Sequence, residues 1–87
     1  DFITLDFETY YDKTYSLKKM TPVEYVLDPR FEVIMLAVKY PGRDPFVLEE
    51  HEIQAWFNSL DPNNTCLITH NALFDMCIVA WKYNFIP

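Results

Sequence analysis

The fold is decided by one stretch of the chain, TCLITHNALFDMCIVAW (residues 65–81). Its first part, Thr65 to Thr69, is β-branched and apolar and predicts a strand. Its second part, Ala72 to Trp81, carries apolar residues almost all round a helix, which is typical of a deeply buried helix. A strand that leads directly into a buried helix indicates an α/β fold with a parallel strand at this point.

Three further strands are expected on the N-terminal side of this stretch. Residues 2–7 are β-branched and aromatic, and residues 32–40 contain a run, 33–38, that is apolar at every position. Such a run predicts a strand that is covered on both faces. A turn at 41–45 leads to a short strand at 46–48, so the second and third strands should form a hairpin.

Two helices and the sheet define the fold class. In the insertion 9–31, Thr21 is a suitable N-cap, a proline follows it, and Glu24 completes a capping box. This helix should end near Leu27, because the residue before Pro29 is pushed to extended geometry. Apolar residues at helical spacing predict the other helix: Ile53, Trp56, Phe57 and Leu60. We expect an α/β mixed sheet, with strands 1–3 antiparallel, strand 4 parallel and helices on its faces.

Composition excludes several classes of protein. Eighty-seven residues suit one small domain, and 51% hydrophobic with 17% aromatic residues exclude a disordered chain. A single glycine excludes a Gly-rich nucleotide-binding loop. No stretch approaches the roughly 18 apolar residues of a membrane span, so no membrane partner is expected. Cys66 and Cys77 suit reduced packing residues, which favours a cytoplasmic location.

Positive charge is concentrated in the insertion. The net charge is −6, which argues against wrapping bare nucleic acid, yet residues 9–31 hold four bases and three acids. Tyrosines alternate with lysines there: Tyr10, Tyr11 and Tyr15 lie beside Lys13, Lys18 and Lys19. Aromatic rings interleaved with bases suit stacking on a single strand. The alternative is that the tyrosines pack the insertion onto the sheet.

Four oxygen-bearing side chains stand out. Asp75 is the one charged residue on the buried helix, where a carboxylate is costly unless it is compensated, and an ion pair with Lys82 is the structural alternative. Asn71 lies four residues earlier, where it also suits an N-cap. Asp6 and Glu8 lie on the same face of the first strand, where they repel each other unless a cation lies between them or solvent covers them.

Topology should bring these side chains together. If strand 4 lies parallel to strand 1, the C-terminal ends of both strands open onto one crevice. Asp6, Glu8, Asn71 and Asp75 then converge there, and His70 lies at the same crevice, where it contacts phosphate or caps the strand end. Oxygen ligands without a thiolate favour Mg²⁺ or Mn²⁺. Two such ions could hydrolyse a phosphodiester bond.

The residues resemble a known family. Asp6-Phe7-Glu8-Thr9 resembles the first motif, and residues 71–75 (NALFD) resemble the second motif, of the DnaQ-like (DEDD) 3′–5′ exonucleases, which have a ribonuclease-H-like fold. The runs 2–11, 16–20, 28–33 and 70–75 are most similar to the N-terminal proofreading domain of phage DNA polymerases of the polymerase I type. This likeness spans essentially the whole chain.

The resemblance implies a role for each matching residue. Asp6 would bridge two Mg²⁺ or Mn²⁺ ions, Glu8 would hold one ion and contact the 3′-terminal hydroxyl, and Asp75 would serve the second ion. Asn71 would orient substrate or a metal ligand. Thr9 would contact the terminal nucleotide through its backbone, next to Tyr10 and His70 as further substrate-binding positions.

The third family motif, a Tyr or His followed by a fourth metal-binding Asp, does not occur after Asp75. The resemblance therefore implies that residues 1–87 are a partial 3′–5′ exonuclease domain, incomplete at the C-terminus. The parent protein would also carry a polymerase domain and would act on single-stranded DNA 3′ ends. It would work in the cytoplasm, which is that of the host cell if a phage encodes it. We expect the chain itself to bind metal weakly and to cut poorly or not at all. The alternatives are a degenerate module that binds nucleic acid or a polymerase without catalysis, and an RNA-directed exonuclease.

Overall fold

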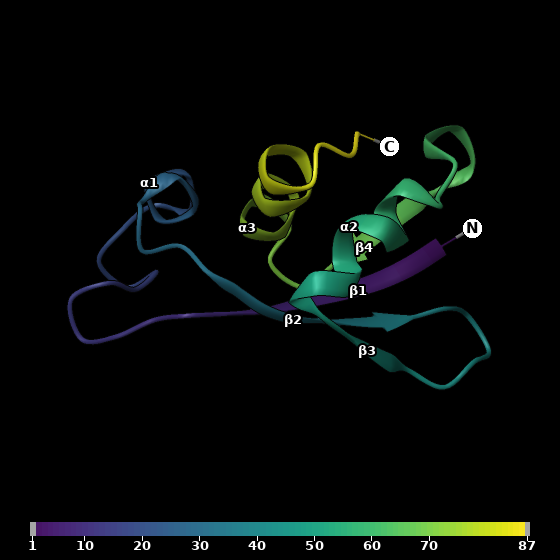
Figure 1. The fold of residues 1–87 in the computed structure, drawn as a ribbon, viewed down its shortest axis with the longest axis horizontal. Coiled ribbons are helices and arrows are strands. Elements are labelled where there is room, and N and C mark those ends of the chain that lie inside the picture. The colour runs from purple at the N-terminus through teal and green to yellow at the C-terminus, as the bar shows by residue number, and fades with distance from the viewer. Residues whose placement is uncertain (1, 87) are drawn as a thin grey trace.

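The computed structural model describes residues 2–86 and contains four strands among them (Figure 1). The elements follow one another in the predicted order. They are β1 (Phe2–Thr9), α1 (Pro22–Leu27), β2 (Val33–Lys39), β3 (Phe46–Glu49), α2 (Glu50–Asn58), the 3-10 turn η1 (Pro62–Asn64), β4 (Cys66–Thr69), α3 (Ala72–Cys77) and the π-helix η2 (Ile78–Lys82). Each predicted strand and helix is present, with its ends within a few residues of the expected positions.

The sheet is mixed and has the order β3-β2-β1-β4. β1 pairs antiparallel with β2, β2 pairs antiparallel with β3, and β4 joins β1 in parallel. Leu5 is paired with Val38 on one side and with Thr69 on the other. This arrangement confirms the α/β class and the ribonuclease-H-like strand order, in which the C-terminal ends of β1 and β4 share one edge of the sheet.

Helices α2 and α3 lie over the same face of the sheet. Strand β1 sends Ile3, Leu5 and Phe7 to this face, where all three are buried. The ring of Phe7 stacks on Tyr83, which follows η2, with ring centroids 6.1 Å apart. Tyr83 in turn stacks on Phe57 of α2 at 5.3 Å. The core therefore lies between this face and the two helices.

The opposite face carries apolar side chains that are open to solvent. Met35, Val47 and Ile68 lie on it and are 36%, 56% and 46% exposed. Ile34 is also exposed, beside a register shift between Glu8 and Thr9. The prediction that residues 33–38 are covered on both faces is wrong for the part of the chain that the structure describes, because α2 and α3 both pack on the other face.

The insertion 9–31 is held by stacked tyrosines. The Tyr15 ring is fully buried and stacks on Tyr25 of α1 with centroids 4.3 Å apart. The Tyr15 hydroxyl donates to the Tyr25 carbonyl at 2.6 Å, and the Arg30 guanidinium lies 4.6 Å from the centre of the Tyr15 ring. The Tyr25 ring also meets Phe74 edge to face at 5.6 Å. Tyr15 therefore packs the insertion onto the molecule, as one of the two alternatives had it.

The last helix widens after one and a half turns. Helix α3 passes into η2 at Ile78, and the Tyr83 amide donates to the Ile78 carbonyl at 3.4 Å. Ile78 and Val79 are buried, but Trp81 is half exposed, so its predicted burial is wrong. The wider turn changes which side chains face the core. Within residues 2–86, no helix has the length and hydrophobicity that a membrane span requires.

Candidate metal-binding site at the β1–β4 edge

The first part of the site is the shared C-terminal edge of β1 and β4. The parallel register pairs Leu5 of β1 with Thr69 of β4, so the residues that follow this last pair at the edge are Asp6 and His70. Both side chains are exposed, and they line a cavity of about 450 Å³ together with residues 4–5 and 68–69. The topology therefore brings a carboxylate and an imidazole to the place where open α/β sheets bind ligands.

The second part is Asp75 in the first turn of α3. Its side chain is only 3% exposed. The backbone amide of Asn71 donates to Asp75 Oδ2 at 3.4 Å, and the backbone amide of Asp75 donates to the backbone carbonyl of Asn71 at 2.9 Å. Within residues 2–86, no lysine or arginine nitrogen lies within 4.0 Å of this carboxylate, so the alternative of an ion pair with Lys82 is wrong.

Burial raises the pKa of Asp75 to about 6. The hydrogen bond from the Asn71 amide opposes this rise, the negative charge of Asp6 adds to it, and a positive charge on His70 opposes it. The structure thus places Asp6 and His70 on one cavity, while Asp75 is bonded to the backbone of Asn71 in the first turn of α3.

Glu8 lies on the same face of β1 as Asp6, as the alternation predicts. It is paired with Met35 and precedes the register shift at Thr9, a bulge-type irregularity of the kind that often re-aims side chains beside functional sites. The carboxylate oxygens of Asp6, Glu8 and Asp75 do not all lie within 4.8 Å of one another. Glu8 therefore shares a face of β1 with Asp6, but the three carboxylates do not form one tight cluster.

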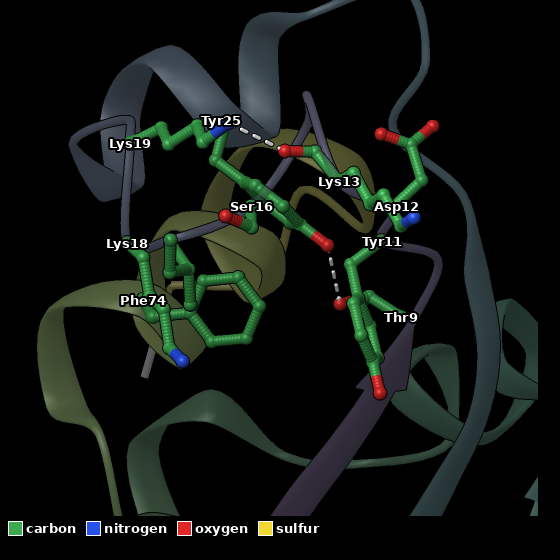
Figure 2. A pocket seen from close by; sticks show the side chains of 10 residues that line it. Thr9, Tyr11, Asp12, Lys13, Ser16, Lys18, Lys19, Tyr25 and Phe74 are labelled. Carbon is green, nitrogen blue, oxygen red and sulfur yellow. Dashed lines mark hydrogen bonds between the residues drawn. The ribbon is translucent and has the colours of Figure 1, made fainter.

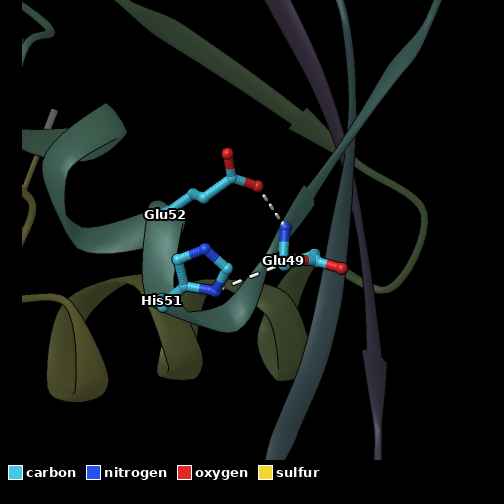
Figure 3. A group of neighbouring side chains, drawn as sticks. All are labelled: Glu49, His51 and Glu52. Atoms are coloured by element: carbon cyan, nitrogen blue, oxygen red, sulfur yellow. Dashed lines mark hydrogen bonds and ion pairs between the residues drawn. The ribbon is translucent and has the colours of Figure 1, made fainter.

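One compact group of metal-ligand types does occur among the described residues, at the start of α2 (Figure 3). Glu49, His51 and Glu52 offer ligand atoms within 4.8 Å of one another, and all three are exposed. Glu52 Oε1 accepts the Glu49 amide at 2.9 Å, and His51 Nδ1 lies 3.8 Å from Glu49 Oε2. These contacts are those of a helix N-terminus that is capped by its own acids.

Thr9 and Tyr10 are held by Tyr25. The Tyr25 hydroxyl donates to the Tyr10 carbonyl, and the Thr9 hydroxyl lies 3.0 Å from the same phenol oxygen. The Tyr10 amide donates to the Glu32 carbonyl at 2.9 Å, and the exposed Tyr10 hydroxyl donates to Asp12 Oδ2 at 2.6 Å. The backbone that follows the first motif is therefore fixed in place. The sequence predicts Tyr25 only as part of a short helix, because the contacts of its ring and its hydroxyl depend on tertiary packing.

Asn71 occupies the N-cap position of α3, but its side chain makes no capping hydrogen bond. Its backbone amide and carbonyl both contact Asp75, and its side chain is exposed at the same end of α3 as His70. The side-chain amide of Asn71 therefore does not act as the N-cap of α3, which was the alternative role for this residue. The Asn71 side chain is therefore open to solvent at the start of α3.

A second, larger cavity lies directly after the first motif. It measures about 590 Å³ and is lined by Thr9, Tyr11, Asp12, Lys13, Ser16, Leu17, Lys18, Lys19, Tyr25 and Phe74 (Figure 2). Figure 2 shows Tyr25 in the middle of the group, with Lys18 and Lys19 on one side and Thr9, Tyr11 and Lys13 on the other. The alternation of tyrosines and lysines was its sequence signal, but the contribution of Phe74 depends on tertiary packing.

Comparison with known proteins identifies no relative. No protein-family model matches the chain, and no curated protein or solved structure shows significant similarity to it. The function is therefore argued from the residues and the geometry of this edge of the sheet.

Proposed function

We propose that the chain is the N-terminal part of a metal-dependent 3′–5′ exonuclease domain that hydrolyses phosphodiester bonds at DNA 3′ ends and is attached to a DNA polymerase. Asp6, Glu8 and Asp75 are the metal ligands and catalytic residues of this proposal. Thr9, Tyr10, His70 and Asn71 bind the substrate. The motif residues 6–9 and 71–75 supply the assignment to the DnaQ-like class.

One observation carries the proposal: the Asp75 side chain is only 3% exposed, and within residues 2–86 no lysine or arginine nitrogen lies within 4.0 Å of its carboxylate. Asp6 lies toward the C-terminal end of β1, and Asp75 lies in the first turn of the helix that follows β4, so both positions belong to the edge where β1 and β4 end in parallel. A buried carboxyl with no cationic partner among the described residues is costly for stability. Such an arrangement is typical of a site that is adapted to a bound cation.

The donor set fits a hard divalent cation. Carboxylate oxygens from Asp6, Glu8 and Asp75 are ligands that Mg²⁺ and Mn²⁺ accept, and the site has no thiolate. When bound, such ions activate water and stabilise the charge of a leaving oxygen. The Thr9–Tyr10 backbone, which Tyr25 fixes, would orient the end of the strand, and the His70 and Asn71 side chains would face its phosphate groups.

The chain itself should bind metal weakly. No acidic residue follows Asp75 in the sequence, so a fourth carboxylate ligand and a residue to position the attacking water are missing from these 87 residues. Metal affinity depends on the number of charged ligands. We therefore expect measurable Mn²⁺ binding together with little or no cleavage of single-stranded DNA.

The test is a titration with Mn²⁺, in which the signal of the free ion is followed by electron paramagnetic resonance. Asp6→Asn and Asp75→Asn should each weaken binding by about tenfold or more, because each removes one of few charged ligands. Asp44→Asn is the matched control, since it removes one carboxylate at the β2–β3 turn, far along the chain from β1 and β4. It should bind Mn²⁺ like the wild type.

Two results would count against the proposal. If Asp6→Asn and Asp75→Asn bind Mn²⁺ as the wild type does, the edge of β1 and β4 is not a metal site. If binding is lost only in Glu49→Gln or Glu52→Gln, the group at the start of α2 holds the ion instead. Cleavage of single-stranded DNA that is lost in Asp6→Ala would support the metal site and contradict the expected inactivity.

A further inference from the structure

Strand β1 loses its regular pairing where the first motif ends. Glu8 is paired with Met35, whereas the next residue, Thr9, is paired with Val33, so one residue of β2 is passed over. An extra residue of this kind disrupts the ladder locally and increases the twist of the two strands. The ladder alone therefore does not fix the backbone directly after Glu8, and the direction of the Glu8 side chain depends on what else holds this backbone.

The hydroxyl of Tyr25 makes contact at this point. It donates to the backbone carbonyl of Tyr10, and the Thr9 hydroxyl lies 3.0 Å from the same phenol oxygen. Because a phenol has one proton to donate, the Thr9 hydroxyl is the donor in the second contact. The two residues that follow Glu8 are therefore both bonded to a side chain of α1, which lies outside the sheet.

Tyr25 is itself held firmly. It is 1% exposed, and its ring stacks on Tyr15 with centroids 4.3 Å apart. The Tyr15 hydroxyl donates to the backbone carbonyl of Tyr25 at 2.6 Å. The Tyr25 ring also meets Phe74 edge to face at 5.6 Å, and Phe74 directly precedes Asp75 in α3. One buried side chain thus contacts the residue after Glu8 and the residue before Asp75.

We propose that Tyr25 is a positioning residue of the metal site. Its hydroxyl fixes the backbone after Glu8, while its ring packs on α3 beside Asp75. The inference rests on the proposed function, because it concerns the direction in which Glu8 is presented to a metal ion. Tyr25 acts through Glu8 and not as a ligand, since its hydroxyl is engaged by Thr9 and Tyr10. Groups that orient metal ligands commonly contribute to metal affinity without touching the ion.

Tyr25→Phe tests the contact with β1 alone, because it removes the hydroxyl and keeps the packed ring. The probe is Mn²⁺, titrated into the full chain and followed by electron paramagnetic resonance. Mn²⁺ binding should weaken by about three- to tenfold. This is less than the loss of roughly 10–100-fold for partners bonded directly to a ligand, because Tyr25 acts through the backbone. Circular dichroism at the titration temperature checks that each variant is folded.

Tyr15→Phe is the matched control, since it also removes a buried tyrosine hydroxyl from the insertion. The bond that it deletes goes to the Tyr25 carbonyl in α1 and not to β1. It should bind Mn²⁺ like the wild type. An equal loss of Mn²⁺ affinity in Tyr15→Phe and Tyr25→Phe would mean that both act only through the packing of the insertion, and the inference would be overturned.

A double-mutant cycle with Glu8→Gln separates positioning from a general loosening of the fold. Glu8→Gln should itself weaken Mn²⁺ binding, and Tyr25→Phe should then have little further effect, because the carboxylate that it positions is gone. A structural role would give the same loss of affinity in both backgrounds. That result, or wild-type affinity in Glu8→Gln, would overturn the inference.

Thr9→Val provides a second variant in case Tyr25→Phe does not fold. It removes the other side of the same contact and nearly keeps the size of the side chain. Mn²⁺ binding should weaken in the same direction, and this loss should also disappear in the Glu8→Gln background. An unchanged Mn²⁺ affinity in Thr9→Val, together with the wild-type affinity of Tyr25→Phe where that variant folds, would contradict the inference.

The variants of the proposed ligands separate this inference from the proposed function. If Asp6→Asn and Asp75→Asn bind Mn²⁺ as the wild type does, the proposed metal site fails and the role of Tyr25 fails with it. If both variants weaken binding but Tyr25→Phe does not, the metal site stands and only the role of Tyr25 is overturned.

Discussion

Asp75 shows how a single side chain can oppose stability. Its pKa is about 6 in the folded protein and near 3.8 in the unfolded chain, mainly because burial disfavours the charged form. The folded state therefore binds the proton more tightly. Below the unfolded pKa both states are protonated, and the free energy of unfolding then falls as the pH rises from about 4 to about 6. Above that range the folded protein carries a buried charge.

Asp75→Asn should therefore stabilise the metal-free protein at pH 7. The two pKa values differ by about two units, which corresponds to about 3 kcal/mol at most, and the asparagine oxygen can still accept the Asn71 amide. At pH 4 the variant and the wild type should have nearly equal stability. Urea denaturation in EDTA at both pH values measures the effect. Equal destabilisation at both values would show that the carboxyl group has a structural role.

The Tyr25 hydroxyl has the opposite effect, because it stabilises the segment that leads away from β1. Tyr25→Phe keeps the stacked ring but removes the donor to the Tyr10 carbonyl and the partner of the Thr9 hydroxyl. We expect a loss of about 1–3 kcal/mol in the free energy of unfolding. Hydrogen exchange of the Tyr10 amide should also become faster. Tyr11→Phe, at an exposed ring with no such bonds, should change neither quantity.

Helix α1 could be predicted from the sequence because its signals are local. Thr21 accepts the Glu24 amide at 3.2 Å, and Glu24 Oε1 accepts the Thr21 amide at 2.9 Å, which is the predicted capping box. The helix ends at Leu27, and Asp28 is extended before the proline, with ψ of 141°. The change from α3 to the π-helix η2 could not be predicted. Apolar residues occur almost all round the helix at 72–81, so the sequence has no one-sided apolar pattern whose shift would reveal a wider turn.

The capping box of α1 leads to a prediction for the whole insertion. Thr21→Ala should lower the free energy of unfolding by about 1 kcal/mol, because the Glu24 amide loses its acceptor. Thr21→Ser keeps the hydroxyl and should lose much less. Thermal unfolding of the two variants gives the comparison. An equal loss in both would mean that the threonine methyl group, and not the hydroxyl, supports the helix.

The molecule as a whole has more surface than its size requires. Its accessible area is 5769 Å², against about 5,400 Å² for a folded chain of this mass. Its extents are 38 × 24 × 22 Å. The open face of the sheet accounts for part of this surface. Its exposure was not predicted from the sequence, because the apolar run at 33–38 does not distinguish a strand covered twice from one covered once. The parallel pairing of β1 and β4, which puts the C-terminal ends of both strands at one edge, was predicted because a strand that leads directly into a buried helix indicates it.

Adjacent strand positions can test this arrangement. Val47 lies on the open face, paired with Ala37, whereas Leu36 is fully buried on the covered face. Val47→Lys should change the free energy of unfolding by no more than about 0.5 kcal/mol, because surface substitutions away from special features are nearly neutral. Leu36→Ala should cost about 2–5 kcal/mol through the cavity that it leaves. Val47→Lys should also reduce the fluorescence of the dye ANS, which binds exposed apolar surface. A loss of stability in Val47→Lys as large as that in Leu36→Ala would mean that the chain covers this face in solution.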